Sequence, residues 1–225
     1  MVAELRHPRL LRARRGFSLV ELLVVLSIVA LLAAVTVPSF RGVVQNYQLK
    51  DSGNRVIGCI SQSRQWALSK NQDVEIRFYK DTRNGRYDSI VSLVPANTNS
   101  GSGVQWLTKP YYLPTDVVFN VSTGTFSSVI SAATASSDSP DAVTADNGAG
   151  TPLSLQGESY VAFRFRPDGS TDLDPSINPA GASASWWLTL TNVGASAGSG
   201  GAPANDFVTI LIDPIMGRTR LYQPR

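Results

Sequence analysis

Cysteine and histidine are almost absent from this 225-residue sequence, which contains only Cys59 and His7. A single cysteine cannot form a disulfide within the chain. His7 lies among the first 16 residues, and the absence of histidine from the rest excludes Ser-His-Asp catalysis, Cys-His catalysis and histidine-ligated metal sites there. No motif indicates another catalytic centre. We therefore expect a protein that is not an enzyme, with no catalytic residue, no cofactor and no metal site.

Charge is also sparse, and it is unevenly distributed. Residues 1–16 contain five arginines and one glutamate, which leaves 15 basic and 16 acidic side chains in the rest of the chain. Because the chain after residue 16 has almost no net charge, it is not a general binder of polyanions, and a nucleic-acid site would have to be a local patch. Because Lys and Arg beside a membrane span stay on the cytoplasmic side, the basic N-terminus places the residues after about 40 on the outer side.

The most informative feature present is an apolar run at residues 17–37, directly after the basic segment. Its 21 residues match the roughly 20 that a helix needs to cross a bilayer. Glu21 is the only charged residue in the run, and an unpartnered carboxylate there costs roughly 3 kcal/mol. Cleavage between Gly16 and Phe17 would supply a partner, because the new α-amino group would lie one helical turn from Glu21.

Three simpler interpretations explain less of this segment. An ordinary secretory signal has a shorter apolar region and a small-residue cleavage site, for which residues 34–36 are the only candidate. Residues 14–17 resemble a twin-arginine export signal, but no cofactor-binding motif follows, and an acidic residue in the apolar run is unusual for such a signal. A plain membrane anchor explains the span but neither Gly16-Phe17 nor Glu21.

The segment resembles the N-terminus of the type IV pilin and pseudopilin superfamily. Its members have a short basic leader ending in glycine, a phenylalanine that is N-methylated after cleavage by prepilin peptidase, and a glutamate four residues later in a long apolar helix. Gly16, Phe17 and Glu21 match these positions, and Pro38 matches a helix-kinking proline just past the apolar run. The resemblance implies a cleaved leader at residues 1–16, processing at Gly16-Phe17 and a role for Glu21 in assembly.

Helical periodicity continues beyond the apolar run. It predicts one helix over residues 17–69, with a transmembrane part at 17–38 and an amphipathic second half at 39–70. Gly53 and Gly58 lower the helix propensity and predict local loosening near residues 51–58.

The pattern changes to period two at residue 74. Residues 74–79 alternate between apolar and more polar side chains, which predicts a half-buried strand. Stretches 131–157 and 192–206 are rich in Ser, Ala, Gly, Thr and Asp and predict flexible loops. The expected fold class is α+β, with the long N-terminal helix packed on an antiparallel β-rich head at residues 71–225. Further strands are expected near residues 86–93, 116–121, 126–130, 159–166, 185–191, 207–213 and 218–222.

Three downstream runs narrow the resemblance to the GspH/FimT family of minor pilins and pseudopilins. They are Ser-Arg-Gln-Trp-Ala-Leu-Ser-Lys-Asn at 63–71, Phe-Arg-Pro-Asp-Gly at 165–169 and Gly-Arg-Thr-Arg at 217–220. In DNA-binding members, a Gly-Arg-x-Arg element near the C-terminus contacts DNA, which implies a DNA contact at Arg218 and Arg220. Two arginines on one strand face can clamp phosphates, but the same pattern also fits a charged, solvated strand.

Two further groups of residues have simpler explanations than a binding site. Arg164 and Arg166 would extend the DNA patch, although exposed arginines on a strand are ordinary. Asp168, Asp172 and Asp174 form an oxygen-rich run of the kind that can hold Ca²⁺, but their spacing matches no EF-hand. A structural turn is favoured for them.

The sequence therefore predicts a structural assembly protein. We expect a minor pilin or pseudopilin, single-pass in the cell inner membrane with its C-terminal head in the periplasm, that is incorporated at or near the tip of a filament. Its expected partners are prepilin peptidase, other pilins or pseudopilins and inner-membrane lipid. DNA would be a further partner if the protein serves as a receptor for DNA uptake. A type II secretion pseudopilus and a type IV pilus share this architecture, so the sequence leaves that choice open.

Overall fold

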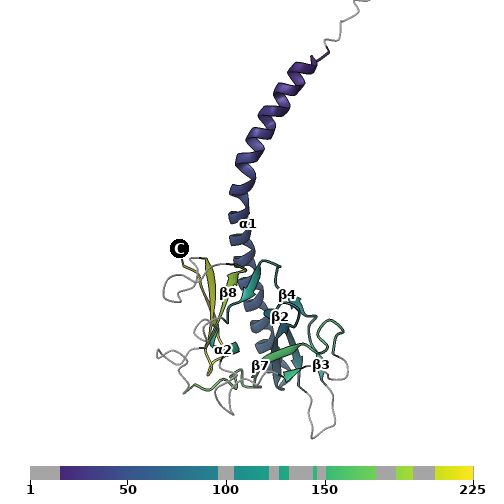
Figure 1. Ribbon diagram of the computed structural model, residues 1–225. Helices are drawn as coiled ribbons and strands as arrows, with labels where there is room; N and C mark the ends of the chain where they lie inside the picture. Colours follow the sequence, from purple (N-terminus) through teal and green to yellow (C-terminus); the bar gives the residue numbers. More distant parts are fainter. Residues whose placement is uncertain are drawn as a thin grey trace, which may run out of the picture. The chain divides into compact units, whose positions relative to one another are not determined.

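The computed structural model describes residues 16–95, 104–121, 127–131, 144–145, 151–175, 186–194 and 206–224, without the side chains of residues 35–41, 131, 144 and 145. The chain divides into two compact units, Met1–Val43 and Val44–Arg225. Helix α1 (Leu19–Lys70) contributes to both (Figure 1). The fold class is α+β, as predicted, because a long helix precedes an antiparallel sheet.

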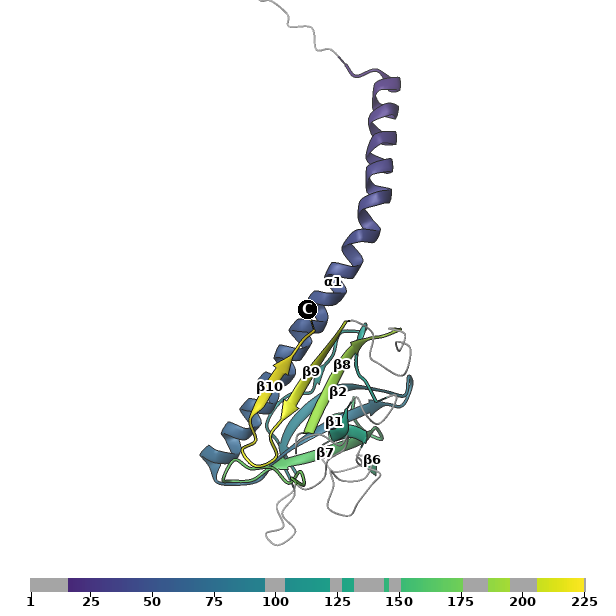
Figure 2. The same ribbon diagram turned by 90° about the vertical axis from the view of Figure 1, so that its left-hand side faces the viewer.

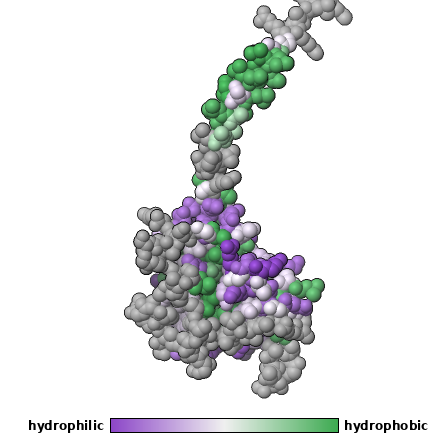
Figure 3. Space-filling view, viewed as in Figure 1, coloured by the Kyte–Doolittle hydropathy of each residue, from purple (hydrophilic) through white to green (hydrophobic). Residues whose placement is uncertain are grey.

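In the first unit, α1 is apolar on all sides. Every described side chain from residue 16 to residue 34 is exposed, and most are Leu, Val or Ile (Figure 3, the green part of the helix). Within the part of the chain that the structure describes, no helix has the length and apolar character that a membrane crossing requires. The predicted span at residues 17–38 stays a prediction.

The second unit contains one antiparallel sheet. Its described strands follow the order β10-β9-β8-β5-β2-β1-β7-β6, and β3 and β4 also pair with β2. Of the predicted strands, all but the one near residues 126–130 are present within two residues of the expected bounds. The strands are β1 (Val74–Asp81), β2 (Arg86–Val94), β3 (Gln105–Trp106), β4 (Tyr111–Tyr112), β5 (Val117–Phe119), β6 (Thr144–Ala145), β7 (Ser159–Phe165), β8 (Trp186–Asn192), β9 (Phe207–Ile212) and β10 (Thr219–Tyr222).

The strand predicted near residues 126–130 is wrong, because this segment forms the short helix α2 (Ser128–Ser131). Two serines at the start of this helix bind the edge of β8. Oγ of Ser127, the residue before the helix, accepts the amide of Thr189 at 3.0 Å, and Oγ of Ser128 accepts the amide of Trp187 at 2.8 Å. Strand β5 pairs only with the last three residues of β8, so the two hydroxyls satisfy donors that a longer strand would have bound.

The second half of α1 packs one face against the sheet. Leu49, Val56, Ile60 and Ala67 are at most 2% exposed and recur at intervals of seven, four and seven residues, which places them on one side of the helix. They join the aliphatic and aromatic side chains of the inner sheet face in a single core cluster.

The predicted loosening near residues 51–58 is wrong, because α1 is continuous there. A methyl group on Gly53 would lie 2.7 Å from Cγ1 of Val208 and 3.3 Å from Cδ1 of Leu221. Glycine at this position therefore permits the close approach of the helix to β9 and β10, which run beside it in Figure 2.

Strand β1 is not half-buried as predicted, because residues 74–79 are buried on both faces. On the outer face, Tyr79, Val91 and Leu155 form a second small core cluster. Leu155 belongs to a described turn within the predicted loop 131–157. Apart from this turn, its flanking residues 151–152 and strand β6, that loop lies outside the described residues, as does the 192–206 loop apart from its ends.

The helix–sheet contact gives a test with a matched control. Replacing Gly53 by Ala adds a methyl group where Val208 has no room, at a typical cost of about 1–3 kcal/mol, and regains only about 1 kcal/mol of helix propensity. We expect urea unfolding of the detergent-purified protein to show a net loss of up to about 2 kcal/mol. Gly58 has no neighbour within 4 Å of an added methyl group. Gly58→Ala should instead stabilise the protein by up to about 1 kcal/mol, and equal effects of both changes would contradict the close approach.

Candidate functional site

The predicted processing residues lie at the start of α1. Phe17 is 81% exposed and precedes the helix, and Glu21 is exposed in its first turn. A carboxylate near a helix N-terminus is favoured by the helix dipole. Pro38 lies within α1, whose backbone is helical on both sides of it, and the expected kink stays a prediction.

The three downstream runs that carry the narrower resemblance meet in one place. From residues 63–71, Arg64 donates through Nε to the carbonyl of Gly169, at 3.2 Å, in the Phe-Arg-Pro-Asp-Gly turn. From the C-terminal run, Gly217 lies so close to this turn that a methyl group on it would collide with the carbonyl oxygen of Gly169 and approach the Phe165 ring to 2.8 Å. The sequence gives no signal for this convergence, because the runs are about 50 to 150 residues apart.

Arg218 lies just before β10 and is exposed. Together with Arg64 it lines an open groove of about 300 Å³, whose other lining residues are Ser61, Gln65, Gly217 and Thr219. Arg220 is exposed on β10, where the neighbouring Thr219 and Leu221 are half-buried. Arg64 is thus a third cation beside the two predicted ones, and sequence reasoning did not single it out.

Arg164 and Arg166 differ in their surroundings. Arg166 is exposed, but Arg164 binds a buried carboxylate: its Nε lies 2.7 Å from Oε2 of Glu75, whose side chain is 2% exposed. Arg77 binds the other oxygen of Glu75, and its guanidinium lies 4.2 Å from the centroid of the Tyr160 ring. Burial lowers the pKa of Arg77, but attraction to Glu75 and hydrogen bonds outweigh burial and raise this pKa overall. Arg164 therefore has a structural ion pair.

The Asp168, Asp172 and Asp174 run forms a turn. Asp168 accepts the amide and the hydroxyl of Ser170 at 2.8 and 2.6 Å, and these hydrogen bonds lower the pKa of Asp168. Asp172 accepts the amide of Arg164 at 2.7 Å, while burial raises its pKa. Within the described residues, no group of three or more His, Cys, Asp or Glu side chains is placed to hold a metal ion.

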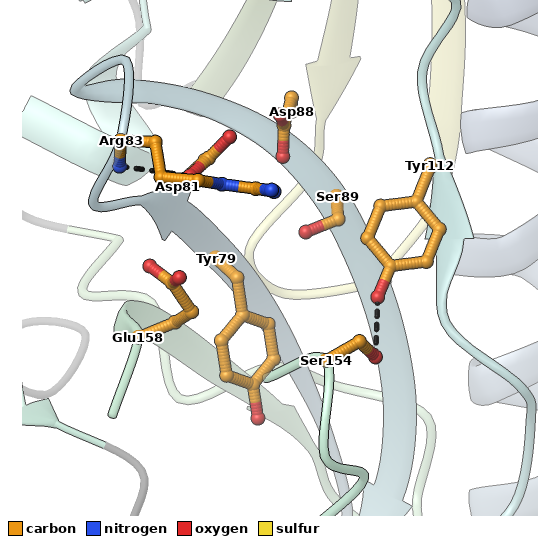
Figure 4. Close-up of a pocket in the computed structure, with 8 residues that line it drawn as sticks. All are labelled: Tyr79, Asp81, Arg83, Asp88, Ser89, Tyr112, Ser154 and Glu158. Atoms are coloured by element: carbon orange, nitrogen blue, oxygen red, sulfur yellow. Dashed lines mark hydrogen bonds and ion pairs between the residues drawn. The ribbon is translucent and has the colours of Figure 1, made fainter. Parts of the chain in front are cut away.

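A small polar pocket of about 50 Å³ lies beside the β1–β2 hairpin (Figure 4). Asp81 accepts Nε of Arg83 at 3.0 Å, and this bond lowers the pKa of Asp81. Glu158 accepts the amide and hydroxyl of Thr82, each at 2.6 Å. Burial raises the pKa of Asp88 in the same pocket. Two of the three carboxylates thus fix the hairpin, and the remaining space suits water rather than a larger ligand.

Comparison with known proteins decides the nature of the N-terminal segment. Residues 11–37 match the model of the prokaryotic N-terminal methylation motif, which includes Gly16, Phe17 and Glu21. The chain has a type IV pilin-like N-terminus.

Beyond this type IV pilin-like segment, the comparisons add little. A search of curated proteins found no match. Among solved structures, the minor pseudopilin EpsH from the type 2 secretion system of Vibrio cholerae is similar over 78% of this chain and 97% of its own, at 12% identity and a TM-score of 0.42. A TM-score below 0.5 gives this likeness no weight for fold or function.

The contact between Gly217 and Gly169 predicts a large cost for a single methyl group. Gly217 has a φ of 61°, and Ala there combines about 1–2 kcal/mol of left-handed backbone strain with the collision described above. We expect Gly217→Ala to lower the free energy of unfolding by about 2–5 kcal/mol in urea titration.

Gly157 provides the matched control. Its φ is 77°, but nothing lies within 4 Å of an added methyl group, so Gly157→Ala should show the backbone strain alone, about 1–2 kcal/mol. Equal losses in the two variants would show that the collision is relieved at no cost and would contradict the tight junction of the two turns.

Proposed function

We propose that the protein is a minor pilin or pseudopilin, a structural subunit assembled at or near the tip of a type II secretion pseudopilus or a type IV pilus. The match of residues 11–37 to the N-terminal methylation motif carries this proposal. Prepilin peptidase would cleave between Gly16 and Phe17, and Phe17 would become the N-methylated first residue. The role proposed is structural, not enzymatic.

The exposed apolar helix supports an anchor in the inner membrane. A helix that is apolar all round is stable where lipid or other helices surround it. The span would comprise residues 17–38, of which the last four have side chains outside the described set. The arginines of residues 1–16 would hold the N-terminus in the cytoplasm and the head in the periplasm.

Glu21 would act in assembly. Among packed apolar helices, a carboxylate gains far more from a nearby ammonium group than it does in water, because the effective dielectric constant is low. The N-terminal amine of a neighbouring subunit would supply that charge. Before assembly, membrane lipid would surround the apolar helix. In the filament, the helices of other pilins or pseudopilins would replace the lipid.

Processing and assembly can be separated by two substitutions. We expect intact-mass analysis of the membrane-purified protein to show a chain that begins at N-methylated Phe17. Gly16→Val should leave the leader attached, because a side chain at this position blocks the peptidase site. Position 21 lies beyond the cleavage site, so Glu21→Val should be processed normally. Its amount in sheared filaments should still fall at least about tenfold, because the N-terminal amine of the neighbouring subunit is then left as an unpartnered charge.

Two outcomes would refute the proposal. A mature wild-type chain that begins at any other residue removes the prepilin assignment. Normal incorporation of Glu21→Val into filaments removes the assembly role of the carboxylate while leaving the processing site intact.

A second candidate function is DNA binding during DNA uptake. The observation in its favour is that Arg64 and Arg218 line one groove, with Arg220 exposed on the following strand. Phosphate contacts of this kind carry no direct base code, so binding would be similar for unrelated sequences.

Gel-shift titration of the detergent-purified protein at two salt concentrations tests this candidate. The salt dependence should correspond to only about two to four neutralised phosphates, because the chain after the leader has no net positive charge. Arg218→Gln with Arg220→Gln should remove most of the binding. Arg86→Gln, a change of an exposed arginine on another strand, should leave it unchanged. Absence of binding at low salt, or equal binding by the double variant, would exclude the DNA function.

A further inference from the structure

The first turn of α1 has backbone donors for which the helix itself offers no acceptor. The helix begins at Leu19, and the amide of Leu22 donates to the carbonyl of Ser18 at 3.1 Å (Figure 1, the purple end of α1). The amides of Leu19, Val20 and Glu21 come before the point where helical hydrogen bonds start. In the proposed membrane span no water would accept them, so each would be costly unless a side chain bound it.

Ser18 occupies the N-cap position of α1. Its carbonyl accepts a hydrogen bond of the first turn, but the residue itself lies just outside the helix. Serine is preferred there because its side-chain oxygen can accept the amide of the second or third helical residue. Inside a helix, a serine hydroxyl can donate to a carbonyl one turn earlier instead, as Ser27 does to Val24 at 2.7 Å. No helical turn precedes Ser18, so its hydroxyl has only the following amides to bind.

The residues around Ser18 complete a pattern that marks helix starts. Glu21 is the third residue of the helix, the position from which a glutamate side chain reaches back to the N-cap amide. Phe17 precedes the N-cap and Leu22 is the fourth helical residue, and apolar side chains at these two positions pair as a hydrophobic staple. The four side chains are exposed in the structure. We call Ser18 and Glu21 the capping pair.

We propose that the capping pair closes into a reciprocal capping box in the membrane, and that Ser18 thereby positions Glu21 for assembly; the second part rests on the proposed function. The hydroxyl of Ser18 accepts the amide of Glu21, and the carboxylate of Glu21 accepts the amide of Ser18. The two bonds satisfy two backbone donors and give the carboxylate a charge-assisted hydrogen bond. Both residues lie after the cleavage site, so the box survives removal of the leader.

The box provides for the same carboxylate before and after cleavage. Before cleavage the chain has no α-amino group at Phe17, and the amide of Ser18 and the helix dipole are the partners within the first turn. Cleavage creates the amino group of Phe17 directly beside that amide. A carboxylate already turned toward this end of the helix has its second oxygen placed for an amine, at little further cost in conformational entropy. Ser18 is therefore a positioning residue that acts through Glu21.

Hydrogen exchange at the amide of Glu21 tests the box directly. After residue 16 the sequence contains only three glutamates, so ¹⁵N-glutamate labelling of the mature protein in lipid bicelles gives three amide signals, from Glu21, Glu75 and Glu158. Glu75 is a buried residue of β1, paired on both sides, and serves as the internal reference. Ser18→Ala should speed exchange at Glu21 relative to Glu75 about fivefold, the typical effect of losing an N-cap side chain. Ser18→Thr keeps the hydroxyl and should exchange like the wild type.

Filament incorporation tests the positioning role. Ser18→Ala should be cleaved between Gly16 and Phe17 like the wild type, yet its amount in sheared filaments should fall about fivefold, in proportion to the lost cap. Ser18→Thr should restore incorporation. Ser27→Ala is the matched control, because it removes the same hydroxyl from the same apolar segment, where that hydroxyl binds the carbonyl of Val24. It should change neither exchange at Glu21 nor incorporation.

Each other outcome overturns a stated part of the proposal. Unchanged exchange at Glu21 in Ser18→Ala refutes the box. Faster exchange with normal incorporation refutes the positioning role, as do equal losses of incorporation in Ser18→Ala and Ser27→Ala. A wild-type chain that is not cleaved before Phe17, or that never enters filaments, refutes the proposed function and with it the positioning role. The exchange ratio then still decides whether the box exists, because that measurement needs no filament.

Discussion

The close approach of α1 to the last two strands is the contact on which the arrangement of the head depends. Gly53 leaves no space between the helix and the side chains of Val208 and Leu221. This seam holds β9 and β10 against the helix. Because β9 and β10 are joined by the turn at Asp213–Gly217, the seam also determines where that turn lies. The same geometry brings Arg64, Gly169 and Gly217 together, and with them Arg218, the exposed arginine of the groove.

The arginines of the head fall into two physical classes. Arg77 and Arg164 are bound to Glu75, a carboxylate that is buried from water. Removing one partner from such a buried group is costly, so these charges serve the fold. Arg218 and Arg220 are exposed outside any such network among the described residues. Charges of this second kind contribute little to stability and are the ones available to a binding partner.

Local patterns in the sequence predicted the helix and the long strands well, because burial imposes a period of 3.6 or 2 on at least four consecutive residues. These local patterns failed where a segment distant in the sequence changes the surroundings of a residue. Glu75 looked like the solvent face of β1, yet it is buried and bound by Arg77 and Arg164, and Gly53 looked like a weak point until Val208 packed on it. Ser127 and Ser128 bind β8 through hydroxyls, which leave no periodic trace.

The groove that contains Arg218 likewise could not be predicted from local patterns in the sequence. The sequence predicts roles for Gly16, Phe17 and Glu21 because the proposed chemistry depends on spacing within six residues. Arg64 could not be identified in this way, since it joins Arg218 only through a contact between segments about 150 residues apart. Motif reasoning cannot find a residue that only the fold brings to a groove.

The seam at Gly53 also has a consequence for the order of folding. The helix is made first, but the strands that cover its glycine are the last two of the chain. Contacts of such long sequence separation form slowly, because a long loop must close before they stabilise anything. Until β9 and β10 have emerged, the helix face around Gly53 has no cover from these strands. A growing chain that still lacks β9 and β10 is therefore open to aggregation at this face, and the packing of these two strands on the helix closes it.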